Sequence, residues 1–414
     1  MNDSWIYTTL GEAITLQRGF DLPAKDRKLG NIPVVASTGI VGTHNQARVK
    51  APGVVIGRSG SLGFAQFIEK DFWALNTTLW VKDFKGNNPK FIYYLLSYLD
   101  LGKYNVGSGV PTLNRNHIHP LEIYLPPLAE QKAIAHILGT LDDKIELNQR
   151  MNRTLESIAR AIFKSWFIDF DPVRAKMEGR DPVGMSKEIA DLFPDSFVDS
   201  ELGMIPKGWE VKSADKIFNI SIGKTPPRKE SHWFSTSYHN IRWVSIRDMG
   251  ENGLFITDTN EYLIPEAVEK FNIKIVPNHT VILSFKLTIG RLAITDGEMV
   301  TNEAIAHFNI EDRKKISSEY TYLYLSFFDY SLLGNTSSIA QAINSKIIKK
   351  IPILIPSNNL IHFFTSKVNT IFTKINTNQR ESKKIAYLRD TLLPKLISGE
   401  IRIKEAEKIR EKEI

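Results

Sequence analysis

The chain has 414 residues, a net charge of +7 and no cysteine. This length exceeds a single hydrophobic core and predicts two or more domains, and the absence of cysteine excludes disulfides and thiolate metal sites. Residues 1–10 lack a basic stretch followed by an apolar run, and no apolar segment is long enough to span a bilayer. We therefore expect a cytoplasmic protein without a membrane partner. The positive charge is typical of proteins that bind polyanions, although many other basic soluble proteins share it.

Part of the sequence occurs twice. Asn148-Gln149-Arg150 recurs as Asn378-Gln379-Arg380, at a numbering shift of 230 (378 − 148), and the apolar pattern around it recurs as well. Near the start of each copy, Trp5 and Trp209 match at a shift of 204 (209 − 5). A duplicated architecture of this kind predicts two similar surfaces that contact a long partner.

The shift between the copies grows to 227 where Val54 matches Val281 (281 − 54). We predict that most of this growth is an insertion in the second copy, between about Thr225 and Arg247. The two copies are therefore expected to share the same order of structural elements and to differ in that segment.

Each copy begins with short β-branched runs between Gly, Pro and Asn turns, and ends with one long helix. In the first copy the helix follows Pro126-Pro127. About 38 residues at a rise of 1.5 Å give a length of about 57 Å. Apolar residues alternate along the helix in steps of three and four, which is a heptad pattern; they are Ile134, Leu138, Leu141, Ile145, Leu155, Ile158, Ile162 and Trp166.

Asn148 and Asn378 interrupt the two apolar seams at equivalent positions. A buried Asn in a helical seam lowers stability and fixes the register of the pair. These residues therefore predict that the two helices pair with each other, antiparallel if a two-fold axis relates the copies. The alternative is that each helix packs on its own domain.

The resulting fold prediction is α+β. Two mixed α/β domains are each followed by a long helix, and the helices pair as an antiparallel coiled coil with pseudo-two-fold symmetry. The predicted segments are a first domain at 1–125, a central helical spacer at 126–168, an acidic and Pro-rich connector at 169–206, a second domain at 207–355 and a C-terminal helical spacer at 356–414.

Several catalytic signatures are incomplete. Gly223-Lys224-Thr225 ends like a phosphate-binding loop, but Phe218 stands where that loop requires Gly. Asn88-Pro89-Lys90-Phe91 lacks the second Pro of an amino-methyltransferase loop and predicts a helix start instead. No second pair accompanies His117 and His119 at metal-ligand spacing. We predict no catalytic residue and no metal site.

Loops of small polar and basic residues recur in both copies at nearly matching offsets. Gly lets the backbone approach phosphate, Ser, Thr and Arg donate hydrogen bonds to it, and Asn, Gln and Arg can read base edges. One such loop alone is more often a plain hairpin turn, so the prediction applies to the set. The candidate DNA-binding residues are Arg58, Ser59, Ser61, Asn76, Thr77, Ser108, Thr112, Asn114, Arg115, Lys224, Thr225, Arg228, Lys286, Thr288, Arg291, Asn302, Ser338, Gln341 and Asn344.

Five motifs resemble those of the specificity (S) subunits of type I DNA restriction–modification systems. They are the strand-to-helix junction from Leu121 to Lys132, the segment from Trp166 to Lys176, Pro206 to Trp209, Gly223 to Pro226, and Leu392 to Ile401. The resemblance covers essentially the whole chain and is most specific from Pro126 to Trp209. The second junction, from Ile353 to Leu360, lacks the double Pro and the Glu-Gln of the first.

This resemblance implies a noncatalytic reader of double-stranded DNA. Each target-recognition domain would bind one half of an asymmetric bipartite site, and the two helices would set the separation of the half-sites. Two modification subunits would bring S-adenosylmethionine. Restriction subunits would bring ATP-driven translocation and Mg²⁺-dependent cleavage, while this chain itself would bind no cofactor.

Three other functions remain open at this point. The chain could be a stand-alone methyltransferase or nuclease with an unrecognised site, which would bind S-adenosylmethionine or cleave DNA alone. It could serve as the DNA-reading subunit of another restriction–methylase type. It could also be a coiled-coil scaffold, which would show no salt-dependent affinity for duplex DNA.

Overall fold

The computed structural model describes the chain except residues 1–3, 108, 313–314, 334–343 and 414. It divides into two compact units. The first unit comprises Met1–Glu146 with Lys383–Ile414, and the second comprises Leu147–Ser382. The two units are described separately below.

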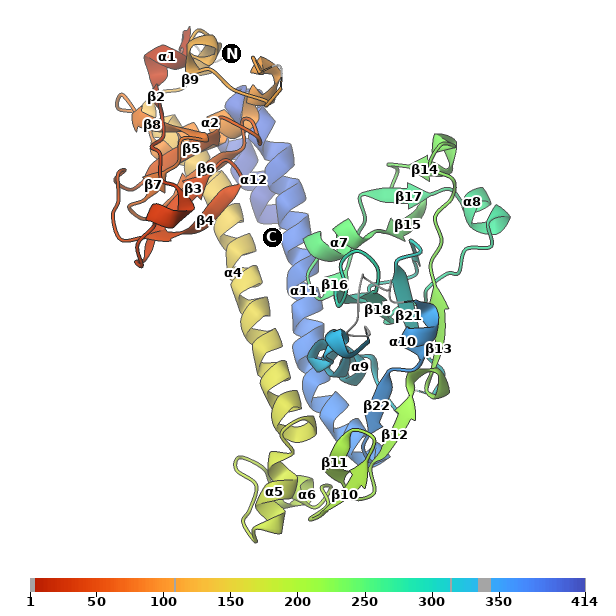
Figure 1. Cartoon of the computed structure of the whole chain (residues 1–414). Helices are drawn as coiled ribbons and strands as arrows, with labels where there is room; N and C mark the ends of the chain where they lie inside the picture. The colour runs from red at the N-terminus through yellow and green to blue at the C-terminus, as the bar shows by residue number, and fades with distance from the viewer. Residues whose placement is uncertain (1–3, 108, 313–314, 334–343, 414) are drawn as a thin grey trace. The chain divides into compact units, whose positions relative to one another are not determined.

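A four-stranded antiparallel sheet forms the centre of the first unit, in the order β2-β8-β5-β6 (Figure 1). Its central strand β5 is buried along its whole length, which is typical of a β-branched run covered on both faces. A three-stranded sheet, β4-β3-β7, and the strand pair β1-β9 complete the β structure. The strands are β1 (Ile6–Thr9), β2 (Thr15–Arg18), β3 (Ile32–Ala36), β4 (Gly39–His44), β5 (Gly53–Gly57), β6 (Ala65–Ile68), β7 (Trp73–Ala74), β8 (Thr78–Asp83) and β9 (Glu122–Leu125).

The helix predicted at Asn88 begins there. Asn88 accepts a hydrogen bond from the backbone N–H of Phe91 at 2.9 Å and caps α2 (Pro89–Tyr98), whose apolar side is buried in the core. The other α-helices among the described residues of this unit, apart from the long pair, are α1 (Leu10–Ala13), α3 (Arg115–Ile118) and α12 (Ile403–Glu413).

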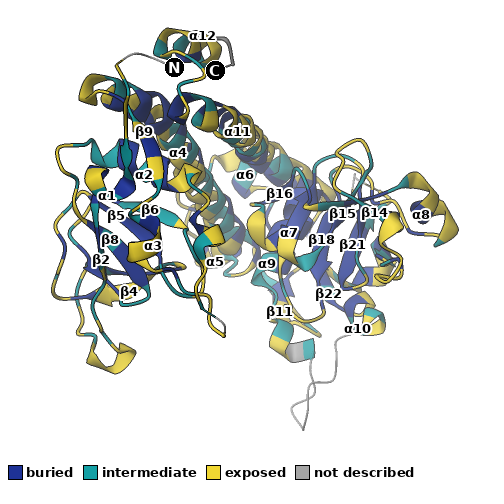
Figure 2. Cartoon of the chain, turned by 90° about the horizontal axis from the view of Figure 1, so that it is seen from above, coloured by how far each residue is buried: buried dark blue, intermediate teal, exposed yellow. Residues whose placement is uncertain are grey.

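The second unit repeats this arrangement with additions. Its main sheet has the order β13-β21-β18-β19-β16, and a second sheet has the order β14-β17-β15-β20. Figure 2 shows β18 and β21 in the colour of buried residues. The strands are β12 (Glu210–Ser213), β13 (Phe218–Ile222), β14 (Phe234–Ser235), β15 (Ile241–Val244), β16 (Phe255–Ile256), β17 (Glu261–Leu263), β18 (Val281–Ser284), β19 (Leu292–Thr295), β20 (Val300–Thr301), β21 (Ile305–Ile310) and β22 (Pro352–Ile355).

Three short helices accompany these sheets. They are α7 (Ile246–Glu251), α8 (Pro265–Lys270) and α10 (Ser345–Lys349). A fourth helix, α9 (Ser318–Phe327), stands where α2 stands in the first copy.

The strand registers match between the copies. Val55 on β5 faces Trp80 on β8, and at a shift of 227 (282 − 55) Ile282 on β18 faces His307 on β21. The predicted position of the insertion was wrong. Val34 and Trp243 hold equivalent places in parallel pairs at a shift of 209 (243 − 34), so only a small part of the growth from 204 precedes β15. The rest follows it, where the second copy adds α7, β16 and α8, which pack their own apolar side chains.

The two long helices, α4 (Leu128–Phe167) and α11 (Asn358–Ile397), are each 40 residues long and pack against each other within each unit (Figure 1). In the first unit, Leu138 of α4 and Leu392 of α11 share one core, and Arg389 donates to Asp142 at 2.7 Å. In the second unit, Asn148 contacts position 381 and Asn152 contacts position 378, so the chains run antiparallel. The α+β prediction with an antiparallel helix pair is confirmed.

The predicted heptad seam was wrong at Ile158, which is 45% exposed. Ala159 and Phe163 are buried instead. The ring of Phe163 packs 5.2 Å from Tyr320 and 5.8 Å from Phe364. This aromatic core turns the buried face of α4 by one residue, because α4 contacts α9 as well as α11 at this point.

The acidic connector packs on the second unit as predicted. Trp166 stacks edge-on against Phe193 at 5.4 Å, and Met185 contacts the same core, whereas Met177 is 56% exposed. The connector contains α5 (Asp171–Met177), α6 (Lys187–Ala190) and the hairpin β10 (Phe197–Ser200) to β11 (Gly203–Pro206). The predicted segments gave each helix a segment of its own, whereas both compact units take part of each helix. Those segment boundaries therefore stay predictions.

Candidate nucleic-acid interface

A cleft of about 980 Å³ opens in the first unit beside β2 and β8. Its walls come from β2 and the residues after it, from β8, and from the loop that leads into α3. Five of its lining residues are cationic and one is acidic, Asp21. The five cations, called the cleft cations below, are Arg18, Arg48, Arg58, Lys82 and Arg115.

Hydrogen bonds to backbone carbonyls position two of the cleft cations and do not neutralise their charge. Arg58 donates to the backbone carbonyl of Asn76 at 3.3 Å, and Arg115 donates to that of Leu16 at 3.2 Å. Arg18 and Lys82 are exposed and, within the described part of the chain, make no side-chain hydrogen bond. No described carboxylate forms an ion pair with any cleft cation. Their charge is therefore available to a polyanion.

Aromatic rings and amide side chains line the cleft together with the cleft cations. The guanidinium of Arg48 sits 5.7 Å from the ring centre of Phe20 and 5.2 Å from that of Trp73, and both rings line the cleft. Gln17 and Asn114 also line it. Amide side chains of this kind can read base edges, and cations position the phosphate backbone. The cleft thus combines both requirements of nucleic-acid recognition.

Four of the predicted residues of the first copy gather in this cleft: Arg58, Thr112, Asn114 and Arg115. The cleft walls do not include four others, Ser59, Ser61, Asn76 and Thr77. Ser108 lies outside the described residues. Asn114 also has a structural task, because its side chain accepts the backbone N–H of Asn116 and caps α3.

Sequence reasoning missed Gln17, Arg18, Arg48 and Lys82. Arg18 and Lys82 belong to neighbouring strands of one sheet, and Arg48 precedes the bridge between Val49 and Phe72. Only strand pairing brings them together. The available signal in the sequence was Arg18 beside Gly19, and the structure shows that a side chain at Gly19 would collide with the backbone of Leu75.

In the second copy, the predicted residues make many internal contacts. Arg228 forms a two-bond ion pair with Glu261, at 2.8 and 2.9 Å, and its charge is neutralised there. Lys224 donates to the carbonyl of Phe271 at 2.8 Å, and Thr225 donates to Glu303.

The remaining predicted residues of the second copy divide into three groups. Asn302 accepts the backbone N–H of Ala304, Asn344 caps α10 by accepting that of Lys346, and Arg291 donates to the carbonyl of Ile246 at 2.9 Å. Lys286 is exposed and Thr288 is half-buried, in the loop between β18 and β19. Ser338 and Gln341 lie outside the described residues.

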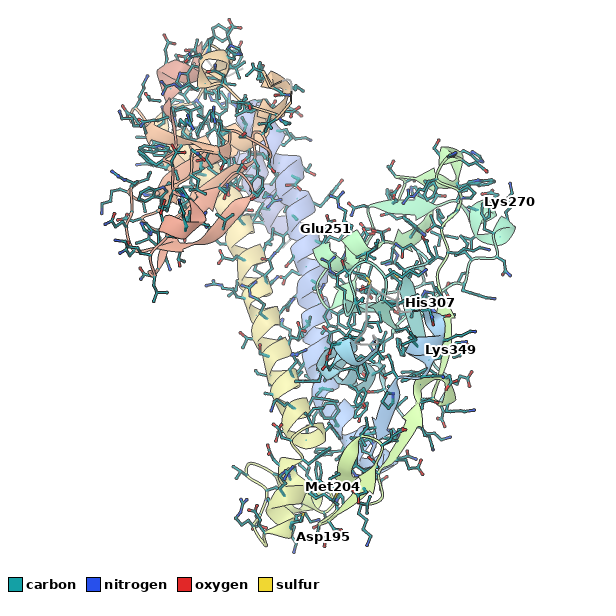
Figure 3. The ribbon with its side chains drawn as sticks, in the orientation of Figure 1. Asp195, Met204, Glu251, Lys270, His307 and Lys349 are labelled. Atoms are coloured by element: carbon teal, nitrogen blue, oxygen red, sulfur yellow. The ribbon has the colours of Figure 1, made fainter. Side chains whose placement is uncertain are left out.

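The second unit contains a buried histidine, His307, on β21 (Figure 3). His307 Nδ1 is 2.8 Å from Ser221 Oγ, and its Nε2 is 2.7 Å from Thr301 Oγ1. Burial lowers the pKa of His307 to about 4, so the ring is neutral at physiological pH. The described residues contain no group of three or more His, Asp or Glu side chains arranged to hold a metal ion.

The two seam asparagines face the opposite helix inside the second unit. Asn148, 1% exposed, donates to Glu381 at 2.8 Å, and Asn378, 0% exposed, donates to Asn152 at 2.8 Å. Position 381 is equivalent to Met151 at the shift of 230 (381 − 151), and Asn378 Nδ2 also lies 3.2 Å from Met151 Sδ. The contact between Asn148 and Glu381 and the contact between Asn378 and Met151 therefore join equivalent positions of the two helices. A role in fixing the register stays a prediction.

Comparison with known proteins decides the family. A family model described as "Type I restriction modification DNA specificity domain" matches residues 2–157 and 206–386. The chain belongs to this family. Both matches cover a recognition domain with part of its long helix, so we name the two mixed domains the first and second recognition domains. The resemblance to type I specificity subunits is confirmed, and with it DNA sequence recognition as the function of these domains.

Curated relatives agree with this assignment. The HindI type I specificity subunit of Haemophilus influenzae is 30% identical over 364 residues, covering 76% of this chain and 77% of that protein. The MjaIX specificity subunit of Methanocaldococcus jannaschii is 28% identical over 333 residues, covering 77% and 71%. The fold is similar to the crystal structure of a type I S subunit from M. genitalium, with a TM-score of 0.60 and 16% identity over 96% of this chain and 97% of that one.

None of the described helices has the length and apolar character that a membrane span requires.

Proposed function

We propose that this chain is the noncatalytic DNA-recognition subunit of a type I restriction–modification complex. The observation that carries this proposal is the cleft of the first recognition domain, which is lined by Gln17, Asn114 and five cations that form no ion pair with a carboxylate of the described residues. Cations position a duplex through its phosphates, and amide side chains read its base edges in the grooves.

The target is an asymmetric bipartite site. Each recognition domain binds one half, and the halves differ because the loops of the domains differ in length and residues. The paired helices α4 and α11 set the distance between the half-sites, since spacing in the protein fixes spacing on DNA. Asn148 and Asn378 hold the register of that pair.

Catalysis belongs to partner subunits. Two modification subunits bring S-adenosylmethionine and methylate the site, and restriction subunits bring ATP-driven translocation and Mg²⁺-dependent cleavage. The specificity-subunit names of the relatives support this division of labour. Methylation requires a base to leave the stack, so the complex also binds a distorted duplex.

Domain exchange tests the proposal. Residues 1–125 are replaced with the first recognition domain of the H. influenzae relative, and both chains are expressed with the same modification subunits. Genome-wide mapping of methylated bases is expected to show one altered and one unchanged half-site. A change in both halves, or methylation that does not depend on this chain, contradicts the proposal.

A second experiment addresses catalysis alone. The purified chain is titrated with S-adenosylmethionine by calorimetry and incubated with duplex DNA and Mg²⁺. We expect neither binding nor cleavage. Either activity in the isolated chain would assign catalysis to it and refute the noncatalytic proposal.

A further inference from the structure

The two recognition domains place different side chains at the same backbone positions. The equivalence rests on matching hydrogen bonds: the N–H of Arg58 donates to Thr77 O at 2.8 Å, and the N–H of Phe285 donates to Ala304 O at 2.9 Å. Donor and acceptor are both shifted by 227 (285 − 58 and 304 − 77). The bridge from Val49 to Phe72 likewise recurs from Val276 to Met299.

This frame assigns a counterpart to every cleft cation, and each counterpart is uncharged. The strand registers align Arg18 and Lys82 with their counterparts. The shared bridge aligns Arg48, and the shared hydrogen bonds align Arg58. The Asn caps of α3 and α10 align Arg115. Arg18, Arg48, Arg58, Lys82 and Arg115 correspond to Ile222, Ile275, Phe285, Asn309 and Ser345.

Total charge does not explain this difference. The sequence gives a net charge of +4 for residues 1–125 (13 − 9) and +2 for residues 207–355 (18 − 16). What differs is where the charges lie and what they contact. Ile275 is 52% exposed in place of Arg48, and Phe285 is buried in place of Arg58. Arg228 of the second domain is paired with Glu261.

We propose that the cleft of the first recognition domain supplies most of the sequence-independent, phosphate-dependent affinity for duplex DNA, and that the second domain binds with few phosphate contacts through the equivalent surface. This inference rests on the proposed function, because it assumes that both domains contact DNA. It makes the first domain the part that holds non-specific DNA during the search for a site.

Salt dependence measures phosphate contacts directly. The logarithm of the association constant falls with the logarithm of salt concentration, with a slope of about −0.9 for each phosphate contact on duplex DNA. The full chain is titrated with a duplex that lacks its target sequence, at salt concentrations between about 50 and 200 mM. Fluorescence anisotropy gives the affinity.

The test variant carries Arg18→Gln and Lys82→Gln, which remove the two cleft cations whose side chains make no hydrogen bond to the part of the chain that the structure describes. Its slope is expected to be shallower by up to about 1.8, which is two phosphate contacts. A matched control, Lys25→Gln with Lys70→Gln, removes the same charge from exposed positions of this domain outside the cleft. The control is expected to keep the parent slope. Thermal unfolding curves verify that both variants fold.

The second domain receives an equal reduction of charge through Lys286→Gln with Arg291→Gln. We expect a smaller change of slope than in the cleft variant. A gain of function completes the test: Ile275→Arg places a cation at the exposed counterpart of Arg48 and is expected to steepen the slope by about 0.9.

The outcomes separate the two proposals. If the parent chain does not bind duplex DNA even at low salt, both the proposed function and this inference are overturned. If the parent binds but the cleft variant keeps the parent slope, or the second-domain variant changes it equally or more, only the unequal division between the domains is overturned.

Discussion

His307 occupies in the second recognition domain the strand position that Trp80 occupies in the first. Trp80 on β8 pairs with Gln17 on β2 and with Val55 on β5. In the same way, His307 on β21 pairs with Ser221 on β13 and with Ile282 on β18. A large apolar ring in one copy is thus replaced by a titratable ring that bonds to two hydroxyl groups in the other. The replacement makes the stability of the second domain depend on pH.

The stability of the second domain is expected to fall in mild acid. The pKa of His307 is lowered from 6.5 to about 4 by burial, so the unfolded chain takes up the proton first as pH falls. This stability is fully present above about pH 6.5 and is lost progressively towards pH 4, by on the order of 3 kcal/mol in total. Urea unfolding of the parent and of His307→Gln between pH 7.5 and 4.5 measures it. A difference between the two proteins that stays constant with pH would contradict this expectation.

Gln131 is expected to anchor the start of α4. Its buried side chain accepts the N–H of Asn88 at 2.9 Å and donates to Asn87 Oδ1 at 2.7 Å and to Pro126 O at 2.9 Å. Gln131→Leu leaves these groups unpaired and is expected to lower the free energy of unfolding by about 1–3 kcal/mol for each buried group that water cannot reach. Chemical unfolding measures this loss.

The matched control for that variant is Gln149→Leu, at an exposed position of the same helix. It is expected to change stability by less than about 0.5 kcal/mol. Equal effects of the two substitutions would show that Gln131 has no special role. The second copy has Ile361 at the equivalent position, at the shift of 230 (361 − 131), and buries it without needing hydrogen bonds.

Replacing both seam asparagines is expected to raise the stability of the helix pair and to weaken the preference of the two helices for a single register. Asn148→Leu with Asn378→Leu removes two buried amides and is expected to raise the unfolding temperature while weakening the single register of the helix pair. Light scattering coupled to gel filtration detects the mixed assemblies that result. A variant that is as monodisperse as the parent and keeps the parent methylation pattern would rule out the register role.

Shortening both long helices by one heptad each is expected to change the spacing of the half-sites but not their sequences. One heptad spans about 10.5 Å of helix, which is about three base pairs of duplex. Methylation mapping with the modification subunits measures the number of bases between the half-sites. Unchanged spacing would refute the helix pair as the device that sets it. A second variant, with Leu147→Gln at an exposed position of α4, serves as a full-length control.

Repeats and periodicity predicted the α+β architecture and the helix pair, and the Asn-Pro motif predicted the helix start at Asn88, because these depend on local sequence. They failed where tertiary contacts decide. Ile158 fits a heptad yet is exposed, since aromatic packing around Phe163 turns the helix. The insertion was misplaced because much of the aromatic and basic segment after Thr225 belongs to β14 and β15, and β15 has a counterpart in the first copy, whereas the added α7, β16 and α8 lie further along the chain.

The binding surface was predicted only in part for the same reason. Arg58 and Arg115 were found through the polar loops that contain them. Arg18 and Lys82 lie on the neighbouring strands β2 and β8. Side chains alternate between the two faces of a sheet, so the sequence alone does not show that both residues line one cleft until the pairing register is known. The charge of Arg228 predicted a contact with DNA, but its partner Glu261 is distant in the sequence and becomes its neighbour only in the folded domain.

The first unit is assembled from both ends of the sequence, and this has a consequence for its synthesis. The whole of the second unit, Leu147–Ser382, leaves the ribosome between Glu146 and Lys383. Until Lys383–Ile414 follow, Leu138 and Leu141 lack Leu392 and Leu396, their partners in the finished core. During synthesis of the second unit, the first domain therefore exposes the apolar face of α4 that carries Leu138 and Leu141, and a chaperone can bind this face. A premature stop near residue 383 would harm the domain made first more than the domain made last.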